Sequence, residues 1–546
     1  MPQFASIVLV MVSCASIGCA QSILPPPPVP AGNPMTPNKI LLGKTLFWEE
    51  QLSSSRSIAC GSCHLPSSGG TDPRVVDGLH PGMDAVFGTA DDVHGSPGVV
   101  HHDASFAPVP TATFGMQTQV TRRRAPSVIN AAYATALFAD GRAADVFRDP
   151  LTGAILLPSG GALESQAAEP PTSDVEMGFH GRSWSDVANS LATMRPLALA
   201  TKPTHELSTY IGQNSYQQLF RAAFGSPGIT PQRIVFAIAA YERTLISDQS
   251  RFDRHLAGQL QLTALEQQGL QRFQTLCASC HTDLQSAVLA TGPVLADYRN
   301  IGVRPVAEDT GREEVTGNPA DRGKFRVPGL RNVALRARFF HNGSATSLTD
   351  VLNFYLRGGD FTDNLDPLMP ALAAQMTPAD FAPLLALMAS LTDPRVALEQ
   401  APFDRPLLWL EGPLLPRRVG FGTAGTHPLA PRATNVGPAY FGNDVFGIGM
   451  DQVAPWLICG VLVSSTGQDQ PLPILGHWLN IDPNSAQILP LTLSLPAANG
   501  GGYANWVFHV PPSTIAAGQH YFQWFAVDPG GPNSFATSNG LRIVIH

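Results

Sequence analysis

The sequence predicts a mainly α protein, in which two helical domains are followed by a C-terminal all-β sandwich domain. Apolar residues recur at helical spacing in several segments up to about residue 392. After about Asp404 this spacing disappears, and short alternating or apolar runs separated by turn residues follow. A five-residue cysteine motif occurs twice, each time shortly after a predicted helix. This repetition indicates two helical domains of related architecture.

The composition predicts a folded protein that does not bind nucleic acid. The chain has 546 residues, of which 44% are hydrophobic and 14% charged, so it is globular rather than disordered. Its net charge is -8, and no run of Lys or Arg provides a basic surface for nucleic acid.

The N-terminus resembles an export signal. An apolar run from Phe4 to Val12 leads to the small-x-small pattern Gly18-Cys19-Ala20, which predicts a signal peptide over residues 1–20. A lipobox ending at Cys19 and a first element of the mature fold are the alternatives. Residues 21–36 form a Pro-rich linker, and no later segment is long enough to cross a bilayer. We therefore expect a periplasmic or otherwise exported protein.

Helices are predicted by periodicity and by their start signals. Thr230 is an N-cap with proline at the next position, and Thr263 with Glu266 forms a capping box. The helical segments are Pro37–Glu49, Ser183–Met194, Ser215–Phe224, Pro231–Ile246, Thr263–Leu276, Ser347–Leu356 and Pro378–Leu391. We expect helical domains at residues 37–246 and 247–398, and the sandwich, for which attachment, assembly or shielding is the expected role, at 405–546.

The two cysteine motifs are typical of c-type haem attachment. They read Cys60-Gly-Ser-Cys63-His64 and Cys277-Ala-Ser-Cys280-His281. Two thiols one helical turn apart meet the vinyl groups of haem, and the adjacent His binds the iron. A thioredoxin-like redox site lacks its βαβ context here, and a structural Cys₄ zinc site would leave both histidines unexplained. The sequence therefore predicts two covalently bound haem c groups.

Residues 37–392 resemble the bacterial di-haem cytochrome c peroxidases and their MauG-like relatives. The resemblance rests on the haem motifs and on the stretches LGKTLFWEEQLSSSRSIACGSCH, RRRAPSVINAAYATALFADGRA, LESQAAEPPTSDVEMG and GKFRVPGLRNVALRARFFHNGSATSLTDVLNFY. It implies that peroxide reacts at the N-terminal, peroxidatic haem and that the C-terminal haem transfers electrons. His64 and His281 would be the proximal ligands.

The resemblance also implies a distal pocket. The stretch LESQAAEPPTSDVEMG would place Gln166 and Glu176 above the N-terminal haem. Glu176 would be the acid/base that moves a proton between the two peroxide oxygens, and Gln166 would hold peroxide or water by hydrogen bonds. The alternative for Glu176 is a carboxylate at a helix N-terminus, satisfied by backbone amides.

Tyr355 aligns with the sixth ligand of the second haem. MauG-like proteins have a Tyr at this position and the classical peroxidases a Met. A phenolate favours ferric iron. Met369 is the rival ligand, and a core tyrosine is the alternative without a functional role.

Three positions depart from the family. Ala139 replaces a Trp between the haems, for which Phe138 and Trp184 are candidate substitutes. Met116 aligns with a loop His that caps the peroxidatic haem, so we prefer an open resting site. Arg124 replaces an Asn that helps to hold calcium. His80, His94, His101 and His102 in the same loop are further candidates for the cap. Separately, Asp84, Asp91 and Asp92 could clasp a calcium ion, and a plain surface turn is the alternative for them.

Three functions follow as hypotheses. The first is a peroxidase that reduces hydrogen peroxide to water with electrons from a small donor protein, a cytochrome c or a cupredoxin. The second is a MauG-like oxidase that uses peroxide to oxidise a partner protein or an organic substrate. The third is an electron-transfer or haem-sensing protein without turnover. Calcium binding and a homodimer are open expectations.

Overall fold

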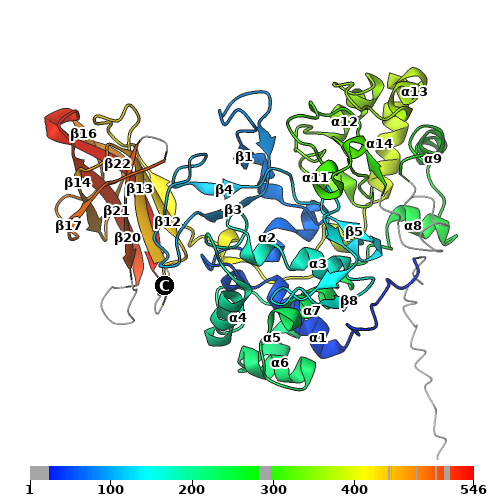
Figure 1. Cartoon of the computed structure of the whole chain (residues 1–546), viewed down its shortest axis with the longest axis horizontal. Coiled ribbons are helices and arrows are strands. Elements are labelled where there is room, and N and C mark those ends of the chain that lie inside the picture. Colours follow the sequence, from blue (N-terminus) through cyan, green and yellow to red (C-terminus); the bar gives the residue numbers. More distant parts are fainter. Residues whose placement is uncertain are drawn as a thin grey trace, which may run out of the picture.

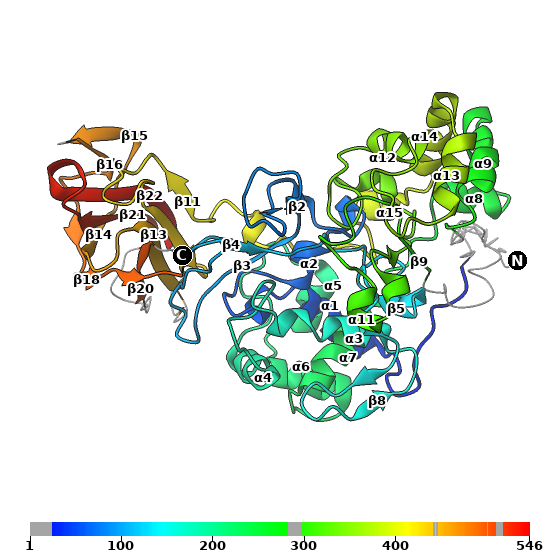
Figure 2. The same cartoon turned by 45° about the horizontal axis from the view of Figure 1, so that its top comes forward.

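The computed structural model describes residues 24–281, 297–440, 443, 446–474, 476–498, 501–508 and 517–545. The predicted signal peptide lies outside these residues. Along the chain come a first helical part, a second helical part and a β region; in Figures 1 and 2 the β region stands apart and the two helical parts adjoin.

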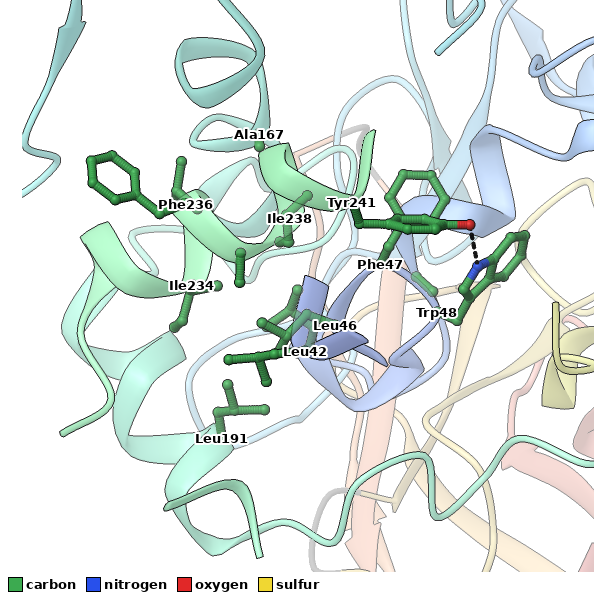
Figure 3. Packing of buried hydrophobic residues seen from close by; sticks show 14 of the residues in the cluster. Leu42, Leu46, Phe47, Trp48, Ala167, Leu191, Ile234, Phe236, Ile238 and Tyr241 are labelled. Carbon is green, nitrogen blue, oxygen red and sulfur yellow. Dashed lines mark hydrogen bonds between the residues drawn. The ribbon is translucent and has the colours of Figure 1, made fainter. Parts of the chain in front are cut away.

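The first helical part is built around two helices, α1 (Pro37–Phe47) and α7 (Pro231–Glu242). Thr36 and Thr230 cap their N-termini, each followed by proline. The helices touch at Gly43, where a Cβ atom would lie 1.9 Å from the carbonyl oxygen of Ala237. Apolar side chains from both helices fill the core, and the Trp48 indole donates a hydrogen bond of 3.3 Å to the Tyr241 hydroxyl (Figure 3).

Shorter elements complete this part. Its other helices are α2 (Cys60–Cys63), α3 (Ala162–Ala167), α4 (Trp184–Thr193), α5 (His205–Ile211) and α6 (Tyr216–Phe224). Its strands pair in sequence as antiparallel hairpins: β1 (Leu79–His80) with β2 (Val93–His94), β3 (Pro97–Val100) with β4 (Thr118–Val120), β5 (Ala136–Leu137) with β6 (Ala143–Ala144), and β7 (Phe147–Arg148) with β8 (Ile155–Leu157).

The second helical part packs α9 (Ala264–Leu276) against α14 (Phe381–Ser390). Gly269 permits this approach, because a Cβ atom there would lie 2.1 Å from the carbonyl oxygen of Pro383. The predicted capping box is confirmed, since Glu266 N–H donates to the Thr263 hydroxyl at 3.2 Å. The remaining elements are α8 (Arg251–Leu256), α11 (Glu313–Thr316), α12 (Leu348–Leu356), α13 (Leu368–Gln375), α15 (Pro394–Ala397), β9 (Tyr298–Arg299) and β10 (Phe325–Arg326).

Within the part of the chain that the structure describes, no single helix has the length and apolar character to cross a membrane. The segments Leu368–Gln375 and Pro378–Ser390 meet that test only when taken together across a bend of 87°.

The β region consists of antiparallel sheets that enclose one core. One sheet has the order β11-β22-β21-β14-β17, with β18 also paired to β14, and another has the order β12-β13-β20-β19. Ile448 from the second sheet and Val461, Trp524 and Ile543 from the first share one apolar cluster. The strands are β11 (Arg417–Val419), β12 (Arg432–Val436), β13 (Phe446–Val453), β14 (Ile458–Ser464), β15 (Gly467–Ile474), β16 (His477–Ile481), β17 (Gln487–Ile488), β18 (Thr492–Leu493), β19 (Leu495–Pro496), β20 (Gly502–Phe508), β21 (Gly518–Val527) and β22 (Phe535–Ile545).

The prediction of a mainly α protein is wrong. Helix accounts for 30% of the chain and strand for 21%. The β region contributes most of the strand, and residues 79–157 of the first helical part add the short hairpins. Glycine and proline are frequent in that segment, and both oppose long helices. Helical periodicity in the flanking segments therefore overstated the helical content.

Candidate active site

The N-terminal cysteine motif opens onto a cavity of about 390 Å³. Cys60, Cys63, His64, Gln166 and Glu176 are all among the residues that line it. The volume falls within the range of about 300–1,000 Å³ that is usual for ligand and cofactor sites. The structure thus brings together the five residues that the sequence placed at the first haem.

The motif itself forms the short helix α2. Ala59 N–H donates to the Ser62 hydroxyl at 2.9 Å, which closes the turn at its start. Burial raises the pKa of the Cys60 and Cys63 thiols, so both are protonated at neutral pH. Two neutral thiols on one turn face the cavity, as thioether attachment requires.

His64 has the geometry of an iron ligand. Its Nδ1 lies 3.3 Å from the carbonyl oxygen of Gly70. Because a carbonyl only accepts, Nδ1 carries the proton and Nε2 keeps its lone pair for a metal. Burial lowers the pKa of His64, which favours the neutral imidazole. The residues present therefore fit a haem.

Glu176 is a carboxyl that can gain and lose a proton at neutral pH. Burial raises its pKa to about 7, against the opposing charge of Arg142 and with a smaller contribution from Glu169. It lies in the turn between residues 173 and 178, whereas the next helix, α4, begins at Trp184. The alternative interpretation, a carboxylate in the first turn of a helix, is therefore wrong.

Glu242 is a second buried carboxyl at this cavity, and the sequence reasoning missed it. It is the last residue of α7, lines the cavity and is 2% exposed. Burial raises its pKa to about 8, against the charge of Arg243. A lone acid ending the apolar run IVFAIAAY was the signal that could have found it.

The second cysteine motif follows α9 directly. Cys277 caps this helix, and His281 N–H donates to the Cys277 carbonyl oxygen at 2.9 Å. Tyr355 on α12 packs in the same apolar cluster as Cys277, and burial beside the Cys277 and Cys280 thiols raises its pKa. Met369 on α13 is 3% exposed and joins Tyr355 in a neighbouring cluster that does not include Cys277. This arrangement favours Tyr355 over Met369 as the residue at the second haem.

The two helical parts meet at Ala139, one of the three positions that depart from the family pattern. The Ala139 carbonyl accepts a hydrogen bond of 2.7 Å from Arg326 N–H. Phe138 lines the cavity, and the Arg142 guanidinium lies over the Phe138 ring, 3.6 Å from its centre. The Trp184 indole lies in the core of the first helical part and donates a hydrogen bond to the Ala168 carbonyl oxygen. Of these candidate substitutes, Phe138 lies nearer the junction.

Arg124 joins the same two parts. Its backbone N–H donates to the His341 carbonyl at 2.8 Å, and its Nε donates to the Phe340 carbonyl at 3.3 Å. Burial lowers its pKa to about 10, so the side chain is still a cation at neutral pH. A guanidinium therefore places positive charge at the junction, and calcium there stays a prediction.

The acidic turn at residues 84–92 uses its carboxylates internally. Asp91 accepts from the backbone N–H groups of Met83 and Asp84 at 2.7 and 3.1 Å, and Asp92 accepts from Gly88 N–H at 2.7 Å. The hydrogen bond from the Thr89 hydroxyl, with those from the Asp84 and Met83 N–H groups, lowers the pKa of Asp91 to about 2. This arrangement favours the surface turn over the calcium clasp.

The loop that carries the candidate capping histidines lies against the β region. Met116 is fully buried, and its N–H donates to Asp451 at 2.9 Å. The residues that line the described cavity do not include His80, His94, His101 or His102. The open resting site stays a prediction.

Comparison with known proteins gives consistent results for the helical parts. A family model described as di-haem cytochrome c peroxidase matches residues 37–261. Cytochrome c551 peroxidase of Nitrosomonas europaea is 30% identical over 344 residues, which cover 61% of this chain and 77% of that protein. Methylamine utilization protein MauG of Methylorubrum extorquens is 28% identical, with 64% and 76% covered. The crystal structure of a MauG-like protein associated with microbial copper homeostasis is 26% identical, covers 71% of this chain and 97% of its own, and has a TM-score of 0.51.

Proposed function

Because the chain belongs to the di-haem cytochrome c peroxidase family, a family of oxidoreductases, we propose that it reduces hydrogen peroxide to two molecules of water. Two electrons would come from a small donor protein, a cytochrome c or a cupredoxin, and two protons from solvent. One observation carries the proposal: Cys60, Cys63, His64, Gln166 and Glu176 come from distant segments and line one cavity.

Two haem c groups would be held by thioethers to the four motif cysteines, with His64 and His281 as iron ligands. When bound, these groups supply the electrons that cleave the O–O bond. The protein would mature in the periplasm or a similar compartment outside the cytoplasm. The haem groups would be attached there, and the electron-donor protein would be present there.

Glu176 would handle the proton in the cleavage step. Its carboxylate takes the proton from the peroxide oxygen nearer the haem and returns it to the departing oxygen, which leaves as water. A pKa of about 7 suits both halves of this transfer at neutral pH. The Gln166 amide can donate and accept at once, which orients peroxide for the transfer.

The second candidate, a MauG-like oxidase of a partner protein or an organic substrate, is favoured by Tyr355. A phenolate is a hard anionic ligand that favours oxidised iron, so it would lower the reduction potential of the second haem and disfavour its reduction by a donor protein. A protein that only transfers electrons would have no use for a cavity with a proton-accepting Glu176.

Steady-state kinetics with the haem-loaded protein separates these functions. Rapid peroxide-dependent oxidation of a reduced cytochrome c or cupredoxin supports the peroxidase. Peroxide consumption that leaves both donors reduced but oxidises an organic reductant supports the oxidase. No peroxide consumption under either condition contradicts both.

A further inference from the structure

A cluster of two histidines and one aspartate lies close in the chain to residues that line the cavity. Ligand atoms of His101, Asp174 and His180 all lie within 4.8 Å of one another. Asp174 stands between Ser173 and Val175, which line the cavity, and His101 directly follows β3, whose Pro97 and Gly98 also line it. We propose that these three side chains bind a divalent transition-metal ion, Cu²⁺ or Zn²⁺. This site is independent of peroxide reduction.

Each side chain presents a suitable donor. His101 Nδ1 lies 3.0 Å from the Val109 carbonyl oxygen, so Nδ1 carries the proton and Nε2 is the ligand atom. His180 Nδ1 lies 2.9 Å from an Asp174 carboxylate oxygen. A metal ion would bind His180 Nδ1 and an Asp174 oxygen in place of this hydrogen bond, with the single imidazole proton on Nε2, so that His180 is a neutral donor.

The cluster is open enough to close around an ion. Metal–ligand bonds of about 2.0–2.2 Å bring ligand atoms to about 3.5 Å from one another, so the three groups must move closer. The side chain of His180 is 79% exposed and that of Asp174 41%, so both can move. Three protein ligands leave one position of a tetrahedral site for water.

The backbone brings the two segments together. At Gly98 a Cβ atom would lie 1.9 Å from the Val175 carbonyl oxygen, so only glycine allows β3 to approach the Asp174 segment this closely. The His101 loop is held from the other side by the β region, where Asn505 donates to the Pro108 carbonyl at 2.9 Å. Figure 1 shows β3 and β4 extending from the first helical part towards β12 and β13. The backbone around His101 is thus held in place, and the exposed side chains of Asp174 and His180 can close onto His101.

The donor set selects the class of ion. Two imidazoles and one carboxylate suit Zn²⁺ and Cu²⁺, and Cu²⁺ binds such donors more tightly. Ca²⁺ and Mg²⁺ require oxygen ligands, so this site would reject them.

Isothermal titration of the haem-loaded full chain with Zn²⁺ and, separately, with Cu²⁺ tests the proposal. After chelator treatment we expect one tight site in the wild type. His180→Ala and Asp174→Asn should each lower the metal affinity of this site by at least about tenfold, because even residues that only hydrogen-bond to a ligand contribute about this much. His205→Ala, at an exposed histidine on α5, is the matched control and should leave this site unchanged.

His180→Ala and Asp174→Asn change exposed side chains, so both variants should fold, and an unchanged haem spectrum verifies that they do. His101→Ala is the third variant and should lose the same site. The proposal is overturned if wild type has no such site, or if wild type, His180→Ala and Asp174→Asn bind with equal stoichiometry and affinity.

Discussion

Replacing Glu176 by Gln tests the proposed proton transfer most directly. Gln keeps the size and one hydrogen-bond acceptor of Glu but cannot take a proton. General acid–base groups contribute about 10²–10⁴ in rate, so we expect the rate constant for reaction with peroxide to fall by about that factor.

The pH dependence gives a second, sharper magnitude. With a pKa of about 7, the carboxylate fraction of Glu176 rises from about one tenth at pH 6 to about nine tenths at pH 8. Since the base must be ionised to accept the peroxide proton, the rate should rise about tenfold across this interval and then level off. Glu176→Gln should remove the inflection.

A neighbouring charge should move the inflection in a known direction. Glu169 raises the pKa of Glu176 and also accepts a hydrogen bond of 2.8 Å from Arg142. Glu169→Gln removes this negative charge, so the midpoint should shift to lower pH. Glu308→Gln, which breaks a distant pair with Arg304, is the control and should shift nothing.

Stopped-flow absorbance of the haem band after mixing with peroxide measures these rates. A wild type without an inflection near pH 7, or a Glu176→Gln variant that reacts as fast as wild type, would rule out proton transfer by Glu176. Unchanged haem content in each variant separates loss of catalysis from loss of the cofactor.

Three further outcomes follow from the structure. Tyr355→Phe should change the electron paramagnetic resonance signal of the second haem in the oxidised protein and Met369→Leu should not; the reverse result assigns Met369 as the ligand. Burial raises the pKa of Glu50 to about 8. Between about pH 5 and 8 the folded protein therefore keeps a proton on Glu50 that the unfolded chain has released. The free energy of unfolding should fall across this interval by at most about 1.4 kcal/mol per pH unit. Urea unfolding should show a weaker decline for Glu50→Gln, and an equal decline would contradict this cause. Gly43→Ala should lower the unfolding free energy, measured by urea unfolding, by about 1–3 kcal/mol through the clash with Ala237. Gly228→Ala, with only the tip of Arg233 nearby, is the control and should have a small effect.

Local features of the fold were predictable because short-range rules govern them. The helices at Pro37, Trp184, Tyr216 and Pro231 begin where caps and periodicity indicated. The content of strand was not predictable in the same way. Hairpins such as β3–β4 depend on pairing between residues far apart in the chain, which periodicity in one segment does not report.

By itself, the sequence identified the family and predicted two haem attachment motifs and the distal residues Gln166 and Glu176, because each of these predictions rests on a contiguous stretch. Only the tertiary structure decided that Glu242 shares the cavity with Glu176, that Arg142 acts on the pKa of Glu176, and that His101 meets Asp174 and His180. The physical reason is that charge, burial and ligand geometry depend on which surfaces pack together. Packing joins residues whose separation along the chain carries no information about their distance in space.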